Sequence, residues 1–181
     1  FSPFILQYEY MQNQSDAFKE VLEQSPYLLV SMADQFVPKM RYTFTYQSPA
    51  TYRNPIYWQT TVSEAANILS LGYAAFGERW NEKGKTMFKN PYAQFLKVET
   101  DLRKTWQTSE HTQLVGHINA GVIWSYGNAE SAPYSEQFYV GGANSIRAFN
   151  VRSIGPGSYY TNQSRLSYMD QTGDIKLQAN V

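Results

Sequence analysis

The sequence predicts an all-β fold, a transmembrane antiparallel β-barrel, on three observations. Apolar and polar residues alternate in segments of roughly eight to thirteen residues, which is the length that a tilted strand needs to cross a bilayer. Short and long connections between these segments alternate, as they do in membrane barrels. Aromatic residues make up 16% of the 181 residues, although the mean hydropathy is negative. This combination suits strands with one apolar face and one polar face.

The alternation predicts about six strands. Each strand places apolar side chains on one face and polar or charged side chains on the other, because successive residues point to opposite sides of a sheet. Four strands have strong alternation, and they cover residues 39–47, 95–106, 113–124 and 174–181. Two weaker candidates cover residues 4–10 and 56–62.

The connections predict how the barrel lies in its membrane. Residues 47–54 and 107–110 are short and polar, whereas the connections near 11–34, 63–91 and 127–173 are long. Membrane barrels have short periplasmic turns and longer extracellular loops. We therefore expect the whole chain, residues 1–181, to be part of one barrel domain with three long extracellular loops.

Two of the long connections are expected to contain helix. Residues 16–23 follow Ser15, whose side chain can accept a hydrogen bond from the first helical turn. The second candidate helix covers roughly residues 64–76.

The composition argues against most kinds of catalytic or binding chemistry. The 15 basic residues offset the 15 acidic ones, so no strong field attracts nucleic acid. The chain has no cysteine and only two histidines, His111 and His117, which are roughly 20 Å apart on an extended strand and cannot bind one metal ion. Gly141-Gly142 lacks the ending of a phosphate-binding loop, and the chain has no nucleophile motif. We expect no enzyme activity, no cofactor and no metal.

Four charged residues share one face of the strand at 95–106, and they are Lys97, Glu99, Asp101 and Arg103. Glu99 and Asp101 could be interpreted as the carboxylate pair of a glycosidase. The stronger interpretation is that alternating charges along the inner wall of a barrel neutralise one another. We therefore expect all four side chains to face the lumen.

The most informative segment lies in the last long connection, at residues 138–157. It contains a Gly-Gly pair, then the tetrad Ile-Arg-Ala-Phe, then a Gly-Pro-Gly turn. These residues are Gly141 and Gly142; Ile146, Arg147, Ala148 and Phe149; and Gly155, Pro156 and Gly157. The segment resembles the sixth extracellular loop of the BamA/TamA family of outer-membrane protein assembly factors, and it looks most like the lipoprotein TamA-like members found in Bacteroidota. It departs from the pattern of that family at Ala148, where the family has glycine.

The resemblance implies a function and a position in the barrel. It implies an outer-membrane protein assembly, insertion or translocation factor in the cell outer membrane of a Gram-negative bacterium. The loop would fold back into the lumen, where acidic and aromatic groups hold Arg147. The chain would supply roughly the seventh to the twelfth of sixteen strands. Its expected partners are the remainder of the barrel, the lipid bilayer, unfolded outer-membrane proteins and periplasmic or accessory subunits.

Two alternatives remain open at this point. A two-partner secretion transporter, which exports a protein through its lumen, would share the barrel. A soluble β-sandwich binding module with tyrosine-rich loops would also alternate apolar and polar faces. A surface hydrolase is a distant third, because no catalytic site supports it.

Overall fold

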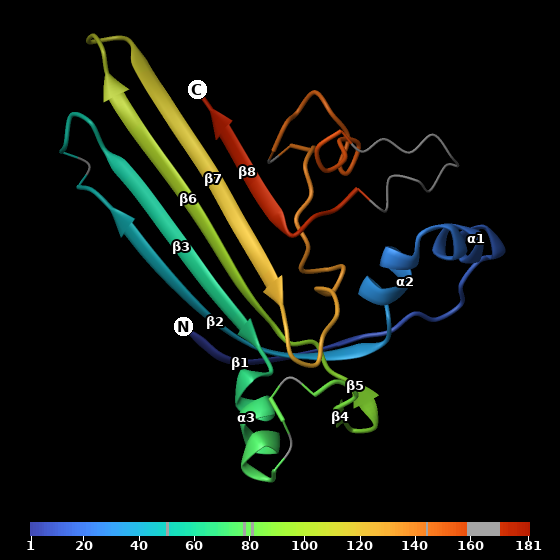
Figure 1. Cartoon of the computed structure of the whole chain (residues 1–181). Helices are drawn as coiled ribbons and strands as arrows, with labels where there is room; N and C mark the ends of the chain where they lie inside the picture. The colour runs from blue at the N-terminus through green and yellow to red at the C-terminus, as the bar shows by residue number, and fades with distance from the viewer. Residues whose placement is uncertain (50, 78, 81, 144, 159–170) are drawn as a thin grey trace.

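The central element of the fold is a six-stranded antiparallel sheet in the order β1-β2-β3-β6-β7-β8 (Figure 1). The computed structural model describes residues 1–49, 51–77, 79–80, 82–143, 145–158 and 171–181. The strands of this sheet are β1 (Ser2–Glu9), β2 (Gln35–Gln47), β3 (Ile56–Ala65), β6 (Phe95–Gln107), β7 (Gln113–Ser125) and β8 (Ile175–Asn180). All six predicted strands are present, and each pairs with its neighbours in chain order.

The strand register sorts the side chains into two faces. One row across the sheet joins Thr45, Gln59, Asp101, Asn119 and Gln178. We call the side that carries this row the charged face, and its charged residues are Glu9, Lys39, Arg41, Lys97, Glu99, Asp101, Arg103 and Lys176. The opposite side is the apolar face. One of its rows joins Tyr42, Val62, Val98, Val122 and Ile175, and the next row joins Phe44, Thr60, Thr100, Ala120 and Leu177.

The apolar face is largely uncovered. Its exposed side chains include Tyr42, Phe44, Tyr46, Trp58, Trp106, Leu114, Ile118, Val122, Trp124, Ile175 and Leu177. The polar groups on this face are satisfied locally, because the hydroxyls of Thr60 and Thr100 are 2.7 Å apart and Lys104 donates to the carbonyl of Asn54 at 2.9 Å. A contiguous apolar surface of this kind marks contact with another apolar partner.

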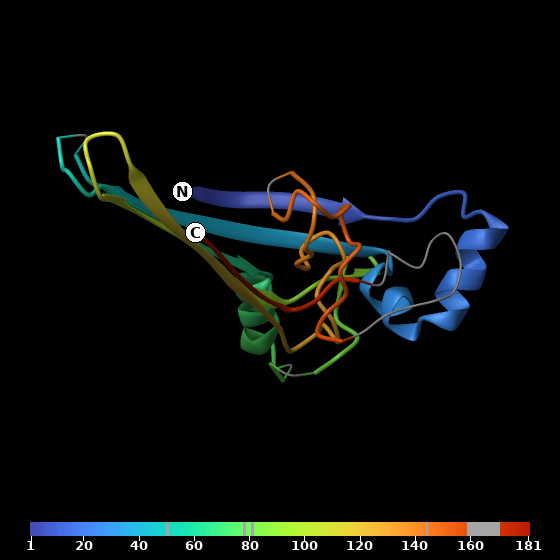
Figure 2. The same ribbon diagram turned by 90° about the horizontal axis from the view of Figure 1, so that it is seen from above.

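The connections place all the helices at one end of the sheet. The turns at residues 48–55 and 108–112 are short and lie together at one end, while the long connections lie at the other (Figures 1 and 2). Figure 2 also shows that the sheet is curved and twisted, as a barrel wall must be. The assignment of the helical end to the cell exterior stays a prediction.

The helices are short. The predicted first helix is confirmed as α1 (Asp16–Gln24), and the Ser15 side chain accepts from the Phe18 amide at 3.3 Å. The predicted second helix is confirmed as α3 (Asn67–Ala75), which starts later than expected because β3 continues to Ala65. The sequence did not predict α2 (Pro26–Ser31) or the small pair of β4 (Thr86–Met87) and β5 (Asn90–Pro91). No helix among the described residues is both long enough and apolar enough to cross a membrane.

The sheet is open in this chain. β1 and β8 form its two edges, and the described residues do not close it into a barrel. The prediction of antiparallel β-structure is confirmed, whereas closure into sixteen strands stays a proposal.

Candidate functional site

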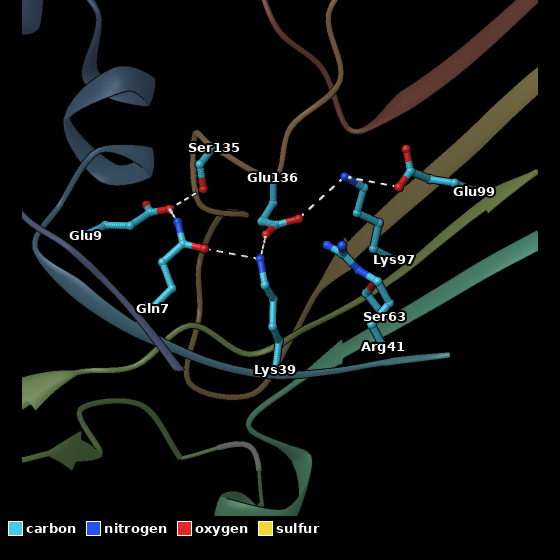
Figure 3. A network of polar contacts seen from close by, with 9 residues as sticks. All are labelled: Gln7, Glu9, Lys39, Arg41, Ser63, Lys97, Glu99, Ser135 and Glu136. Carbon is cyan, nitrogen blue, oxygen red and sulfur yellow. Dashed lines mark hydrogen bonds and ion pairs between the residues drawn. The ribbon is translucent and has the colours of Figure 1, made fainter. Parts of the chain in front are cut away.

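The connection between β7 and β8 folds back onto the charged face, and Glu136 is its main charged contact (Figure 3). Lys39 on β2 donates to one carboxylate oxygen of Glu136, and Lys97 on β6 lies 3.5 Å from the other. The side chains of Lys39 and Glu136 are each 7% exposed and that of Lys97 is 12% exposed. Buried charges are tolerated only when they are paired and hydrogen-bonded. Glu136 therefore joins two strands that are not neighbours in the sheet.

Further polar groups complete this network. Gln7 accepts from Lys39 at 3.2 Å, Lys97 also lies 3.5 Å from Glu99, and Ser135 donates its hydroxyl to Glu9. Burial raises the pKa of the Glu136 carboxyl. The hydrogen bond and charge of Lys39, followed by those of Lys97, outweigh this effect and hold the pKa below its usual value of 4.5. The carboxylate is therefore ionised at neutral pH.

An aromatic contact lies beside the charged one. The ring of Phe138 packs on Gly121 of β7, where an added Cβ would lie only 2.5 Å from a ring carbon. The Lys97 ammonium lies 4.8 Å from the centre of the same ring. The Phe138 backbone also exchanges two hydrogen bonds of 2.9 Å with Gly173. Gly121 thus provides the recess in the sheet that the loop fills.

A small hydrophobic core joins the base of the loop to the sheet. Its buried members are Val37, Ala65, Ala93, Phe95 and Ile123 from the sheet and the segment before β6, and Ala132 and Phe138 from the loop. The loop is consequently held by apolar burial as well as by charge.

The four residues predicted to line a lumen lie together on the charged face. Lys97 pairs with Glu99 at 3.5 Å, and Arg103 donates to Asp101 at 2.8 Å. Asp101 also lies 2.7 Å from a ring nitrogen of His117. These pairs neutralise one another along the strands, and their position inside a closed lumen stays a prediction.

The Gly-Gly pair allows the loop to turn back on itself. Gly141 and Gly142 have φ of +99° and +89°, and a Cβ at Gly141 would lie 2.1 Å from the carbonyl oxygen of Asn150. The Gly142 amide donates to the Phe149 carbonyl at 2.9 Å. Glycine is required at position 141, because any side chain there would collide with backbone.

The tetrad at 146–149 forms a tight turn, in which the Phe149 amide donates to the Ile146 carbonyl at 3.1 Å. Ala148 is not among the residues with positive φ, so alanine fits where the family has glycine. Arg147 is exposed, and its Nε donates to the Ala143 carbonyl at 3.4 Å. The described residues do not test whether acidic and aromatic groups hold Arg147 in a lumen, so the role of Arg147 stays a prediction.

The segment after the tetrad contains an arginine, Arg152, whose role was not predicted. The guanidinium of Arg152 lies over two tyrosine rings, 4.9 Å from the centre of Tyr134 and 4.4 Å from that of Tyr139. Its backbone amide donates to Val140 at 2.9 Å. The turn at Gly155, Pro156 and Gly157 follows a bridge between Val140 and Ile154, and Gly157 has φ of +57°. The richness of the loop in tyrosine was the signal that could have predicted a stacked arginine.

The sequence also missed the roles of Glu136, Phe138 and Gly121. The signal for Lys39 was present, because the alternation at 39–47 places it on the polar face. Nothing in the irregular loop sequence distinguished Glu136 from a solvated carboxylate. Among the described residues no cluster of histidine or acidic side chains could hold a metal ion.

Comparison with known proteins identifies the family. Residues 73–181, more than half of the chain, match the family model described as the Omp85 superfamily domain. The match covers β6, β7, β8 and the loop that lies on the charged face. Members of this superfamily are outer-membrane proteins of Gram-negative bacteria that insert or secrete other proteins without enzymatic chemistry. No solved structure matches the chain. An open two-faced sheet of membrane-spanning length, with a long loop folded onto its charged side, fits this match, and the chain belongs to the Omp85 superfamily.

Proposed function

We propose that this chain is part of the wall of an outer-membrane barrel that assembles other outer-membrane proteins, in the manner of the BamA/TamA family. The observation that carries the proposal is the contrast between the two faces of the sheet. The apolar face is bare and rimmed by Trp58, Trp106 and Trp124, as suits contact with lipid and its interfaces. The charged face carries a folded loop, as suits a lumen.

The open edges support a larger barrel. An unpaired backbone group in the hydrocarbon layer costs several kcal/mol, so strands with free edges do not span a membrane alone. β1 and β8 therefore pair with further strands of the same protein. A barrel of sixteen strands follows from the resemblance of residues 138–157 to the sixth extracellular loop, which also suggests the TamA-like lipoproteins of Bacteroidota.

The mechanism requires no covalent chemistry. A strand at the seam of the barrel pairs with an incoming β-strand, while the barrel perturbs the adjacent bilayer. Residues 1–181 supply the rigid wall opposite that seam. Their loop is fixed by Glu136, and Arg147 adds a second lock once the missing strands provide its partners. The other partners in this proposal are unfolded outer-membrane proteins and periplasmic or accessory subunits.

Reconstitution of the full-length protein into lipid vesicles tests this function. An unfolded outer-membrane barrel added outside the vesicles should become folded in the bilayer, which is detected by heat-dependent migration on a denaturing gel and by protection from protease. Vesicles without the protein give the background rate. A soluble passenger accumulating inside the vesicles, with no insertion of the barrel above background, would show secretion instead and overturn the proposal.

A further inference from the structure

Helix α3 has its polar side buried and its apolar side exposed. The buried side carries Ser70, which is 0% exposed and whose hydroxyl donates to Gln94 at 2.9 Å and lies 3.0 Å from the hydroxyl of Tyr92. Asn67, three residues earlier and on the same side, accepts hydrogen bonds from Gln94 and from the Tyr126 hydroxyl. A helix on a water-covered protein surface shows the opposite arrangement.

The exposed side of α3 is entirely apolar. Ile68 and Leu71 are 65% and 63% exposed, and Phe76, which directly follows the helix, is 92% exposed. Ala75 lies on the same side of the helix. Residues 65–77 contain no charged side chain. This side of the helix therefore presents no charged side chain that water could solvate.

This exposed stripe continues the apolar face of the sheet. Ile68 and Leu69 of α3 line a mainly apolar groove of about 240 Å³ together with Phe4, Pro38 and Met40 of the sheet, and the charged residues Lys39 and Glu64 also contribute to its lining. In Figure 1, α3 follows the end of β3 at the end of the sheet that bears the long connections. Charged residues follow soon after the helix. One of them, Lys83, forms an exposed ion pair at 2.6 Å with Glu130, which lies in the connection between β7 and β8. An apolar surface next to a charged segment is the arrangement expected at a membrane boundary.

We propose that α3 is an interfacial helix whose stripe of Ile68, Leu71 and Phe76 inserts among the acyl chains of the outer membrane beside the barrel. Interfacial helices bury their apolar side roughly 5–10 Å into the boundary between headgroups and acyl chains. Because the stripe is continuous with the face of Phe4 and Met40, the same lipid layer that covers the sheet also covers the helix. The inference rests on the membrane placement of the apolar face given under the proposed function.

Lipid-dependent quenching of a fluorophore tests the inference. A single cysteine replaces Leu71 in the full-length protein without other cysteines, carries an environment-sensitive dye and is reconstituted into phosphatidylethanolamine and phosphatidylglycerol vesicles. A nitroxide near the glycerol end of the lipid chains should quench this dye, whereas iodide in the water should not. Leu177→Cys on the apolar face serves as the lipid control, and Glu82→Cys in the charged segment as the aqueous control. Heat-dependent migration confirms that each variant is folded, and Ile68→Cys replaces Leu71→Cys if that variant is not.

Each outcome decides one point. Lipid quenching at Leu71 and at Leu177, with none at Glu82, supports the interfacial helix. Quenching of Leu71 by iodide to the level of Glu82 overturns it, and protection from both quenchers overturns it in favour of a covering protein surface. If Leu177 is also not quenched by lipid, the membrane placement in the proposed function fails, whereas failure at Leu71 alone removes only the helix from the bilayer.

Discussion

Replacement of Glu136 by glutamine should loosen the loop on the charged face without unfolding the sheet. Glutamine keeps an oxygen acceptor at nearly the same place but removes the charge that faces Lys39 and Lys97. Neither lysine is left without a partner, because Lys39 keeps Gln7 at 3.2 Å and Lys97 keeps Glu99 at 3.5 Å. The effect is therefore smaller than the loss of a buried charge with no replacement.

The magnitude follows from one weakened and one lost hydrogen bond, because the two lysines use different oxygens of Glu136 and glutamine has a single oxygen acceptor. A hydrogen bond to a charged group contributes about 1.5–3 kcal/mol and a neutral one about 0.5–1.5 kcal/mol, so the two changes together lower the free energy of loop opening by about 3 kcal/mol. Because about 1.4 kcal/mol is a factor of ten, the open loop should become roughly a hundredfold more populated. Glu136→Leu removes both acceptors and should cost about 3–5 kcal/mol.

Hydrogen exchange read by mass spectrometry on peptides covering residues 134–142 measures this opening directly. Exchange in the Glu136→Gln variant should accelerate roughly in proportion to the open population. Glu130→Gln is the matched control, because this carboxylate lies in the same loop and pairs with Lys83 at 2.6 Å but is exposed. The control should exchange at the wild-type rate. Wild-type exchange in Glu136→Gln itself would refute the idea that this contact fixes the loop.

The same contact predicts a dependence on pH. The folded-state pKa of Glu136 lies below the usual 4.5, so its stabilisation is complete above pH 4.5 and is lost as the pH falls through the lower, folded-state value. Wild-type exchange at 134–142, corrected for the intrinsic pH dependence of amide exchange, should therefore rise as the pH falls below 4.5. The Glu136→Gln variant should lack this rise, and its persistence there would assign it to another carboxyl.

Three further perturbations test separate parts of the account. Gly121→Ala adds a Cβ about 2.5 Å from a ring carbon of Phe138 and should accelerate exchange in the same peptides. Gly72→Ala adds a Cβ with nothing within 4 Å and should leave the exchange unchanged. Equal exchange rates in the two variants would show that the recess at Gly121 is not needed. Arg147→Ala in the full-length protein should remove a charge-assisted contact worth about 1.5–3 kcal/mol and lower assembly activity, with only partial rescue by lysine. Unchanged protease resistance of the loop and unchanged activity would reject this role. A tag inserted at 128–133 should be accessible on intact cells and one at Thr108 should not, and surface exposure at Thr108 would invert the orientation.

The strands were predictable because each must present one apolar and one polar face over its whole length. The boundaries of the strands were less predictable, as β2 shows. The alternation predicted a start at Lys39, directly after Pro38, which cannot donate a hydrogen bond to a neighbouring strand. In the structure, β2 begins at Gln35 because β1 pairs with it through Pro38 up to that residue. The helix α2 has six residues, too few for a periodic pattern to appear.

The loop contacts were less predictable, because they join residues far apart in an irregular segment. The alternation placed Lys39 and Lys97 on one polar face, but no pattern connected them with Glu136. The family resemblance directed attention to Arg147, which is exposed in this chain, and away from Arg152, which is stacked on Tyr134 and Tyr139. Tertiary contacts of this kind depend on the path of the loop, which the sequence pattern does not determine.

Solvent access to neighbouring residues on one strand tests the two-faced wall most directly. The chain contains no cysteine, so in a full-length protein without other cysteines, single cysteines at Val98 and Ile118 can be compared with those at Glu99 and Asn119 in membranes. Each pair differs by one position, which moves the side chain to the opposite face. A lipid-soluble maleimide should label positions 98 and 118, and a water-soluble one should label 99 and 119. Equal labelling of all four positions by both reagents, or the reverse pattern, would contradict a barrel wall with lipid on its apolar face and a lumen on its charged face.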